Sequence, residues 1–260
     1  MAESPYKNSS LYDARTISVP AEAIADGPSY MDRLLYDRVS AVRKYRVHGG
    51  TVVDIGCATG EALRVFDGFA VKIGVDFSQR YLVEASQRNK AKGSTGYFVT
   101  GDVTALPLAD QICDVVYSFS TLYYITDVLG TYRNIFRILR PGGVAVLDVG
   151  NIQSLNAICC RRYKIDDGYA ALECPRINDT LSALLESGFE ILEHRSFQLL
   201  PLWAAKPRLL WPLLHPKWNS LMKIRIMGKM IDEWISSLPG LKRFAFRHLV
   251  VCRRPKPFGG

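Results

Sequence analysis

Residues 51–61 of the chain, TVVDIGCATGE, decide the fold. Two β-branched residues lead into Asp54, the glycines Gly56 and Gly60 bracket a loop of small residues, and a helical stretch follows over Glu61–Phe66. Glycine accepts a positive φ and lets a ligand approach the backbone, and the start of a helix favours an anionic group. The pattern predicts a strand, a tight turn and a helix around a nucleotide-like ligand, although a glycine pair alone fits a plain strand-to-helix turn equally well.

A second strand and helix strengthen the ligand hypothesis. An apolar run over Ala70–Val75 ends in Asp76, which lies 22 residues after Asp54. In doubly wound folds, a spacing of about 20 residues brings a carboxylate to the hydroxyls of a bound ribose. Ser78 is available as the N-cap of the helix predicted over Gln79–Lys92, so Asp76 is not needed for that role.

Four motifs follow the order and spacing of one enzyme family. They are Asp54–Gly60 (DIGCATG), Val75–Asp76, Thr100–Val103 (TGDV) and Arg140–Gly143 (RPGG). Across Val52–Val149 the chain resembles the class I S-adenosylmethionine-dependent methyltransferases of the small-molecule or glycan type, similar to methyltransferase domains 11 and 25. A nicotinamide-binding domain would instead require G-x-G-x-x-G, and Ala58 stands where its middle glycine would fall.

The resemblance implies a binding site for S-adenosylmethionine at the carboxyl edge of the sheet. It implies that Asp76 binds the ribose, that Asp102 accepts a hydrogen bond from the adenine amino group, and that Val103 offers its backbone N–H to the ring. The backbone near Ser118 would hold the methionine amine. The implied donor-binding residues are Asp54, Gly56, Cys57, Gly60, Asp76, Phe77, Asp102, Val103 and Ser118.

The motifs leave the catalytic residue unknown. Many small-molecule members of the family have a histidine in the stretch that corresponds to residues 120–125, where this chain offers Tyr123 and Tyr124 as candidate bases. Methyl transfer from a sulfonium is limited chiefly by alignment and by dehydration of the nucleophile, so the lack of a histidine is tolerable. Asp148 and Asn151 are expected close to an acceptor, at the end of a strand over 144–149.

The predicted fold class is α/β, a Rossmann-like doubly wound sheet of seven strands, mostly parallel with an antiparallel last strand by resemblance. Further strands are predicted over Gly96–Thr100, Asp114–Phe119, Phe189–Phe197 and Phe246–Cys252, and further helices over Tyr30–Val47, Val128–Leu139 with Asp127 as N-cap, and Asp179–Ser187. The single domain divides into an N-terminal arm and cap helix (1–48), the methyltransferase core (49–202), a basic Trp-rich helical insertion (203–243), and the last strand with a tail (244–260).

The C-terminal part of the chain is strongly basic. Residues 203–260 hold twelve Lys or Arg and two acids, a balance of +10, whereas residues 1–202 hold 21 bases and 23 acids, a balance of −2. Five apolar residues recur at helical spacing and predict an amphipathic helix: Leu221, Met222, Ile226, Met230 and Trp234. Such an insertion fits a lid that also touches a membrane or a lipid-linked acceptor, a nucleic-acid surface, or plain packing.

Composition narrows the class of protein. The first residues lack the basic and apolar stretches of a signal peptide, and apolar segments are broken before the ~18 residues of a membrane span. A cytoplasmic protein is expected, with peripheral membrane association as an open alternative. The six cysteines show no C-x-x-C spacing, so no metal site is expected.

The function predicted from these features is methyl transfer from S-adenosylmethionine to an oxygen atom of a small molecule, a glycan or a glycolipid precursor. Two alternatives stay open: an RNA or DNA methyltransferase that uses the basic C-terminal region, and a non-catalytic interaction protein with the same fold. The acceptor, the acceptor atom and the oligomeric state do not follow from the sequence.

Overall fold

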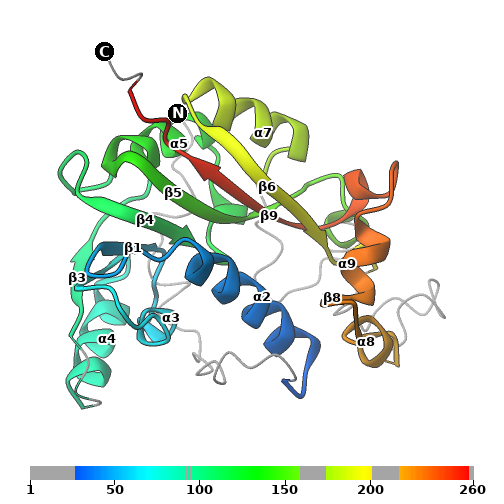
Figure 1. The fold of residues 1–260 in the computed structure, drawn as a ribbon, viewed down its shortest axis with the longest axis horizontal. Helices are drawn as coiled ribbons and strands as arrows, with labels where there is room; N and C mark the ends of the chain where they lie inside the picture. The colour runs from blue at the N-terminus through cyan, green and yellow to red at the C-terminus, as the bar shows by residue number, and fades with distance from the viewer. Residues whose placement is uncertain (1–26, 92, 94, 159–173, 201–216, 258–260) are drawn as a thin grey trace.

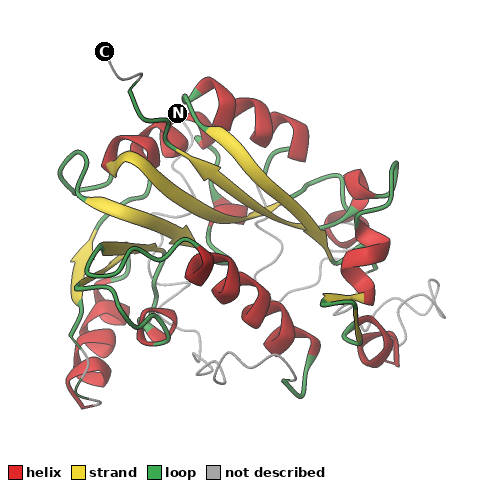
Figure 2. Ribbon diagram, in the orientation of Figure 1, coloured by secondary structure: helices red, strands yellow, loops and turns green. Residues whose placement is uncertain are grey.

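A computed structural model describes residues 27–91, 93, 95–158, 174–200 and 217–257. Its strands form a seven-stranded sheet with helices on both faces, and a short hairpin lies beside the sheet (Figures 1 and 2). The strands are β1 (Thr51–Ile55), β2 (Val71–Asp76), β3 (Tyr97–Thr100), β4 (Cys113–Ser118), β5 (Leu139–Gly150), β6 (Glu190–Phe197), β7 (Arg225–Ile226), β8 (Lys229–Met230) and β9 (Arg247–Arg253).

The helices alternate with the strands along the chain. They are α2 (Tyr30–Lys44), α3 (Glu61–Arg64), α4 (Gln79–Ala91), α5 (Val128–Ile138), α7 (Ile177–Glu186), α8 (Lys217–Met222) and α9 (Ile231–Ser236), with the short 3-10 helices η2 (Leu122–Tyr124) and η5 (Lys242–Phe244). Among the described residues, no helix is both long and apolar enough to cross a bilayer.

The sheet has the strand order β3-β2-β1-β4-β5-β9-β6. Across the sheet, the neighbouring strands β3, β2, β1, β4 and β5 pair in parallel, and β9 runs antiparallel to both β5 and β6. This arrangement confirms the predicted doubly wound sheet with an antiparallel last strand. Because the chain order reverses between β1 and β4, a ligand is expected at the carboxyl ends of these two strands.

Successive residues of the central strands face two different cores. On β1, Val53 and Ile55 belong to the core that includes α5 and α7, whereas Val52 belongs to the core that includes α2 and α3. Strands β5 and β9 alternate in the same way. Side chains along a strand alternate between its two faces, so residues two positions apart share a face. The carboxyls of Asp54 and Asp148 therefore lie on the face that α2 covers.

A capping box fixes the start of helix α2. The hydroxyl of Ser29 accepts a hydrogen bond from the Asp32 N–H at 3.1 Å, and the Asp32 carboxylate accepts one from the Ser29 N–H at 2.9 Å. Buried residues of the helix, among them Leu34, Val39 and Val42, then pack against the strands in the middle of the sheet. The helix therefore lies across the sheet face near the carboxyl ends of β4 and β5 (Figure 1).

Strand β5 begins earlier than predicted. It starts at Leu139, directly after α5, instead of at Val144. The backbone in between is already hydrogen-bonded: the N–H of Gly142 donates to the carbonyl of Arg254 at 2.8 Å, and the N–H of Arg254 donates to Gly143 at 2.9 Å. The glycine pair therefore belongs to β5, between β4 and β9, and does not form a separate turn.

The amphipathic helix predicted through residues 221–234 is wrong. Helix α8 ends at Met222, the hairpin β7–β8 follows, and α9 begins only at Ile231. Met227 and Gly228 have φ angles of 51° and 81°. Two consecutive left-handed residues are what a two-residue hairpin turn requires, and a right-handed helix cannot contain them.

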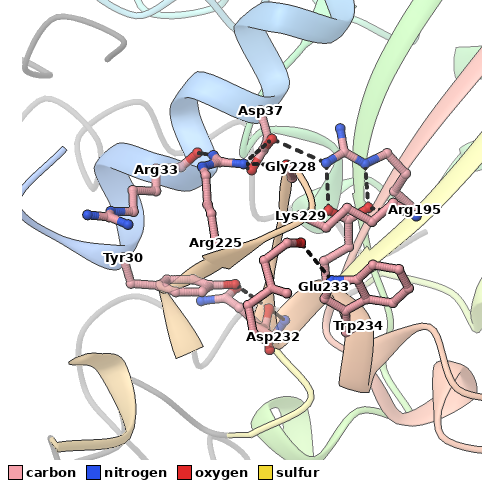
Figure 3. Close-up of polar contacts among 12 residues, drawn as sticks. Tyr30, Arg33, Asp37, Arg195, Arg225, Gly228, Lys229, Asp232, Glu233 and Trp234 are labelled. Carbon is pink, nitrogen blue, oxygen red and sulfur yellow. Dashed lines mark hydrogen bonds and ion pairs between the residues drawn. The ribbon is translucent and has the colours of Figure 1, made fainter. Parts of the chain in front are cut away.

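Charged side chains hold this hairpin against α2 and β6 (Figure 3). The carboxylate of Asp37 accepts hydrogen bonds from Arg225 of β7 at 2.9 Å and from Arg195 of β6 at 3.2 Å. Glu233 of α9 accepts two more from Arg195, at 2.8 and 2.7 Å. Some of the basic residues that distinguish the C-terminal part thus form ion pairs within the fold.

The division of the chain at residues 202 and 243 stays a prediction.

Candidate active site

The loop after β1 turns through three left-handed residues. Gly56, Ala58 and Gly60 have φ angles of 76°, 45° and 69°. The Gly56 N–H donates to the carbonyl of Val75 at 2.8 Å, and the Gly60 N–H donates to the carbonyl of Cys57 at 2.8 Å. The loop is therefore anchored first to β2 and then to itself, which is the tight turn that the sequence predicts.

Close contacts with neighbouring side chains also require glycine at two positions of this loop. A Cβ on Gly56 would lie 2.0 Å from Oγ1 of Thr121, and a Cβ on Gly60 would lie 2.8 Å from Cε1 of Phe98. A side chain at either position would have to displace its neighbour. The backbone of the loop consequently lies close to both β3 and the segment that follows β4.

Asp76 stands at the end of β2 and holds the loop in place. Its Oδ2 accepts a hydrogen bond from the Ala58 N–H at 2.9 Å, and its Oδ1 accepts one from the Ser78 N–H at 2.9 Å. The hydroxyl of Ser78 also accepts from the N–H of Tyr81 at 3.4 Å, as expected of an N-cap, and Phe77 is half-buried beside them. A carboxylate oxygen accepts more than one hydrogen bond, so ribose hydroxyls remain compatible with this carboxylate.

Asp54 is a buried carboxyl at the end of β1. The phenol of Tyr117 on β4 donates a hydrogen bond of 2.9 Å to its Oδ2. Burial raises the pKa of Asp54 to about 8; the hydrogen bond from Tyr117 opposes this rise, and the charge of Asp76 adds to it. A cation bound nearby would favour the ionised form of both carboxyls. Tyr117 was not among the predicted site residues.

The other predicted donor residues lie at the same edge of the sheet. Ser118 is fully buried, and its hydroxyl donates to the carbonyl of Ile55 at 2.8 Å, which ties β4 to β1. Asp102 is exposed, and its Oδ1 accepts hydrogen bonds of 2.8 Å from the N–H and the hydroxyl of Thr104. Val103 is buried beside it. The ends of β1, β2, β3 and β4 thus bring the predicted donor residues together.

These residues fit an adenosyl sulfonium donor. The backbone at Gly56 and Gly60 forms a cradle that a Cβ would fill, and the carboxyls of Asp54 and Asp76 suit a ligand with hydroxyls and a positive charge. Such a donor supplies an activated methyl group on a positively charged sulfur. The contacts assigned to individual residues stay predictions.

The surroundings of Tyr123 make it a poor base. Its side chain is 1% exposed, and its hydroxyl accepts a hydrogen bond from Arg247. Burial raises the pKa of Tyr123 well above its ordinary value, although Arg247 opposes the shift. Tyr124 is buried as well, with the two ring centroids 6.3 Å apart. The geometry therefore disfavours proton removal by Tyr123, and a role for Tyr124 stays a prediction.

Sequence reasoning missed two arginines beside Asp148, a residue that the sequence predicts to lie close to an acceptor. Oδ2 of Asp148 accepts hydrogen bonds of 2.7 Å from Arg38 of α2 and from Arg247 of β9. Burial alone would raise the pKa of Asp148, but the two arginines outweigh burial and lower the pKa below its usual value. Asp148 is therefore ionised and also poorly suited to act as a base.

Two other polar residues of this edge act as local caps. Oδ1 of Asp127 accepts a hydrogen bond of 2.9 Å from the Gly130 N–H, so the predicted N-cap of α5 is confirmed. The amide of Asn151 donates to the carbonyl of Ala245 at 3.0 Å and accepts from the Gln153 N–H at 3.1 Å. These bonds fix loops beside the site.

Comparison with known proteins points to one family. Residues 53–147 match the family model for a methyltransferase domain. The chain is 29% identical to a malonyl-[acyl-carrier protein] O-methyltransferase of Marinomonas sp. over 119 residues, which are 45% of this chain and 44% of the relative. It is 29% identical to an O-methyltransferase of Aspergillus nomiae over 171 residues, 63% of this chain and 72% of the relative.

A sterol 24-C-methyltransferase of Pneumocystis carinii is 25% identical over 158 residues, which are 55% of this chain and 41% of the relative. The chain thus spans less than half the length of the Marinomonas and Pneumocystis relatives that it matches. The matches include both O- and C-methyltransferases, so they leave the acceptor open.

Solved structures share the fold at low sequence identity. A geranyl diphosphate methyltransferase in complex with sinefungin has a TM-score of 0.60 and 16% identity, covering 86% of this chain and 78% of that one. The [4+2]-cyclase SpnF has a TM-score of 0.60 and 19% identity, covering 97% and 92%. Because the fold also occurs in that cyclase, these structural likenesses show the fold alone. The evidence for a methyltransferase domain is the family model that matches residues 53–147, together with the ordered motifs that resemble the class I S-adenosylmethionine-dependent methyltransferases.

Proposed function

We propose that the chain transfers the methyl group of S-adenosylmethionine to an oxygen atom of a small molecule, a glycan or a glycolipid precursor. The observation that carries this proposal is the pair of buried carboxyls, Asp54 and Asp76, beside a loop that has no side chain at Gly56 or Gly60. The relatives named as O-methyltransferases support oxygen as the acceptor atom.

The chain's own residues contribute chiefly by positioning. Displacement at a methyl group requires the acceptor oxygen, the methyl carbon and the leaving sulfur to lie in line, with water kept away from the nucleophile. The closed loop after β1 and the buried ends of β4 and β5 provide a fixed frame for such an alignment. Neither Tyr123 nor Asp148 suits proton removal, which favours acceptors that need little help from a base.

An RNA or DNA methyltransferase is the second hypothesis, and the described residues support it less. Three basic residues of the C-terminal part make contacts within the fold. Arg225 pairs with Asp37, Lys223 donates to the carbonyl of Pro28, and the ammonium of Lys229 lies over an indole ring with 5.0 Å to its centroid. Neutralising these residues would therefore disturb packing as well as charge.

The third hypothesis is a non-catalytic interaction protein with this fold. Incubation with labelled S-adenosylmethionine and a fractionated lysate separates it from an enzyme, because only an enzyme produces a labelled product and S-adenosylhomocysteine in proportion. Donor binding without any turnover across all fractions would favour the interaction protein.

We further propose that the insertion brings the enzyme to a membrane surface or to a lipid-linked acceptor. Four apolar side chains around the hairpin are exposed: Ile224, Ile226, Met227 and Trp234 are 44%, 51%, 88% and 43% exposed. The side chain of Lys229 beside them is 49% exposed. Apolar side chains with a neighbouring cation suit the boundary between headgroups and acyl chains.

Donor binding is the direct test of the proposed function. Replacing Asp76 by Ala removes a charged hydrogen-bond acceptor and the anchor of the loop, so the affinity for S-adenosylmethionine should fall by about 10–100-fold. Calorimetric titration of the folded variant measures this. Asp110→Ala is the matched control, because Asp110 has a side chain that is 69% exposed and pairs only at the surface with Arg137. An unchanged affinity in Asp76→Ala would overturn the proposed donor site.

A further inference from the structure

A cavity of about 500 Å³ lies beyond the carboxyl end of β5 and shares no residue with the predicted donor site. Its walls come from three segments of the chain. Gln153 follows β5, Arg176 stands at the start of α7, and Arg243 with Phe244 belongs to η5. Pockets for small molecules occupy about 300–1,000 Å³, so this cavity has the size of a ligand site.

Hydrogen bonds join the three walls. Asn151 is completely buried; its amide donates to the carbonyl of Arg243 at 2.7 Å, and its Oδ1 accepts from the Gln153 N–H at 3.1 Å. The N–H of Ile152 donates to the carbonyl of Pro175 at 3.3 Å, which ties the same loop to the start of α7. These bonds use backbone groups and one buried amide. The cavity is therefore formed before a ligand enters, and binding would not have to order its walls.

Two guanidinium groups line the cavity from different walls. Arg176 and Arg243 are both exposed, and neither forms an ion pair with any residue that the structure describes. The central carbon of Arg243 lies 4.7 Å from the ring centroid of Phe244, a contact that restricts the orientation of this guanidinium. Cations in a concave site concentrate anions from solution. Both arginines are therefore available to an anionic ligand.

Asp179 is the one carboxylate among the residues that line the cavity. It lies in the first turn of α7, where the partial positive charge of the helix start favours an acidic side chain. Its charge thus has a use within the helix. The other lining residues are uncharged: the amides of Gln153 and Asn178 can form hydrogen bonds, and Ile177 and Phe244 provide apolar surface.

We propose that this cavity binds the phosphate group of a small organic phosphate ester. The planar fork of a guanidinium matches the oxygens of a phosphate, and a phosphate monoester carries close to two negative charges at neutral pH, one for each arginine. The apolar surface of Ile177 and Phe244 suits the organic part of the ester. This site goes beyond the proposed function, because it requires neither the donor nor methyl transfer.

Three small compounds test the chemistry of the site. The full chain is titrated with phenyl phosphate, phenol and inorganic phosphate, and binding is measured by calorimetry. Phenyl phosphate should bind more tightly than either of the others by about tenfold or more. Equal binding of phenyl phosphate and phenol would show that the arginines contribute nothing, and equal binding of phenyl phosphate and inorganic phosphate would show a site for the ion alone. Either result would overturn the assignment to an ester.

Substitution of the two arginines locates the binding. Arg176→Met and Arg243→Met should each weaken the binding of phenyl phosphate by about tenfold. Arg133→Met is the matched control, because Arg133 has a side chain that is 61% exposed and pairs with Glu186 at the surface. It makes the same change in net charge outside the cavity. An equal loss in all three variants would show general attraction of charge and would contradict the site.

A substitution at Asp179 gives a result that misfolding cannot imitate. Asp179→Asn removes a negative charge from the wall at nearly the same shape, so the affinity for phenyl phosphate should rise by about fivefold. Asp110→Asn, at a side chain that is 69% exposed and pairs with Arg137, should leave the affinity unchanged. If Asp179→Asn does not fold, the arginine variants decide. An affinity that is unchanged or lower in folded Asp179→Asn would overturn the proposal.

Discussion

Tyr117 and Asp54 lie directly opposite each other on the neighbouring parallel strands β4 and β1, and the phenol donates a hydrogen bond of 2.9 Å to the carboxyl. Both side chains face the core below α2, and both are almost completely buried. The strand register therefore puts a carboxyl with a raised pKa at the point where a cationic donor is proposed to bind. A donor bound there would make its affinity depend on the protonation of Asp54, and therefore on pH.

We predict that the affinity for S-adenosylmethionine increases from pH 6 to pH 8. Asp54 has a pKa of about 8 without ligand, so at lower pH it carries a proton that a bound sulfonium and ammonium would displace. Above that pKa no proton has to leave, and the affinity should level off. Calorimetry in two buffers of different ionisation enthalpy measures the released proton.

Two variants check the origin of this pH dependence. Asp54→Asn has no carboxyl to titrate, so its affinity for S-adenosylmethionine should lack the increase between pH 6 and pH 8 that Asp54 causes. Tyr117→Phe removes the hydrogen bond that lowers the pKa of Asp54, so the midpoint should move to higher pH. An affinity that is constant from pH 6 to pH 8 in the wild-type chain would contradict the coupling.

The same carboxyl should make the ligand-free protein less stable as the pH rises from about 4 to 8. An unfolded Asp loses its proton near pH 3.9, roughly the model-peptide value, whereas the folded Asp54 keeps its proton up to about pH 8. Between these values the folded state binds more protons, so the free energy of unfolding falls with rising pH.

Two buried histidines change the free energy of unfolding with pH in the opposite direction, so their effect must be separated from that of Asp54. Burial lowers the pKa of His194 to about 4 and that of His248 to about 3. Their contribution to the free energy of unfolding therefore rises as the pH increases from these values toward 6.5, the ordinary pKa of histidine. Urea unfolding of the wild-type chain and of Asp54→Asn at pH 5 and pH 8 isolates the Asp54 component. If the two proteins show the same change with pH, Asp54 is not the group responsible.

Packing behind the donor loop gives a third prediction. A Cβ on Gly74 of β2 would lie 2.6 Å from Sγ of Cys57 and 3.1 Å from its Cβ. Gly74→Ala should therefore lower the free energy of unfolding by about 1–3 kcal/mol through overpacking. Cys57→Ala removes the sulfur, so the double variant should recover part of that loss. Strict additivity of the two single effects in a double-mutant cycle would refute the contact as the cause.

Parts of this site follow from local sequence, and parts do not. Asp54, Gly56 and Asp76 could be placed because each stands at the end of an apolar run, where a strand stops and a loop begins, and Gly60 could be placed because a helical stretch follows it. Arg38 and Arg247 carry no such signal. They reach Asp148 from positions 110 and 99 residues away in the chain: the packing of α2 on the sheet brings Arg38 there, and the pairing of β9 with β5 brings Arg247.

The hairpin within the insertion escaped prediction for a different reason. Its turn consists of Met227 and Gly228, and methionine is not a residue that normally signals a left-handed turn position. Around it, Met222 and Met230 are both buried, although two separate elements supply them, whereas the other members of the predicted apolar face, Leu221, Ile226 and Trp234, are exposed. Helical periodicity therefore predicted the secondary structure wrongly, and burial correctly for only two of the five residues.

The clamp around Asp37 should be important for stability. Its side chain is 6% exposed and pairs with Arg195 and Arg225, whose side chains are 24% and 15% exposed. Asp37→Ala leaves two partly buried guanidinium groups without this partner and should lower the free energy of unfolding by about 3–5 kcal/mol. Asp110→Ala breaks a surface pair with Arg137 and should cost less than about 1 kcal/mol. Chemical denaturation measures both, and similar costs would show that the clamp adds little.

The exposed hairpin should bind anionic membranes if it serves as a membrane contact. Met227→Ser and Ile226→Ser remove apolar side chains that are 88% and 51% exposed, so neither change should affect folding. Each should weaken co-sedimentation with vesicles that contain phosphatidylglycerol, by up to about 150-fold given 1.5–3 kcal/mol for full burial of a large apolar side chain. Leu185→Ser is the matched control, because Leu185 is 57% exposed on the distant helix α7.

The lipid and salt dependence of this binding distinguishes insertion of the hairpin from simple attraction of charge. Apolar contact should persist at high salt, whereas the contribution of Lys229 and other cations should be screened as the Debye length shrinks to about 3 Å at 1 M salt. Neutral phosphatidylcholine vesicles should then bind more weakly than anionic ones at low salt, with the difference disappearing at high salt. If the Met227 and Leu185 variants bind equally, or if the wild-type chain binds no vesicles, the hairpin is a lid or a packing element and not a membrane contact.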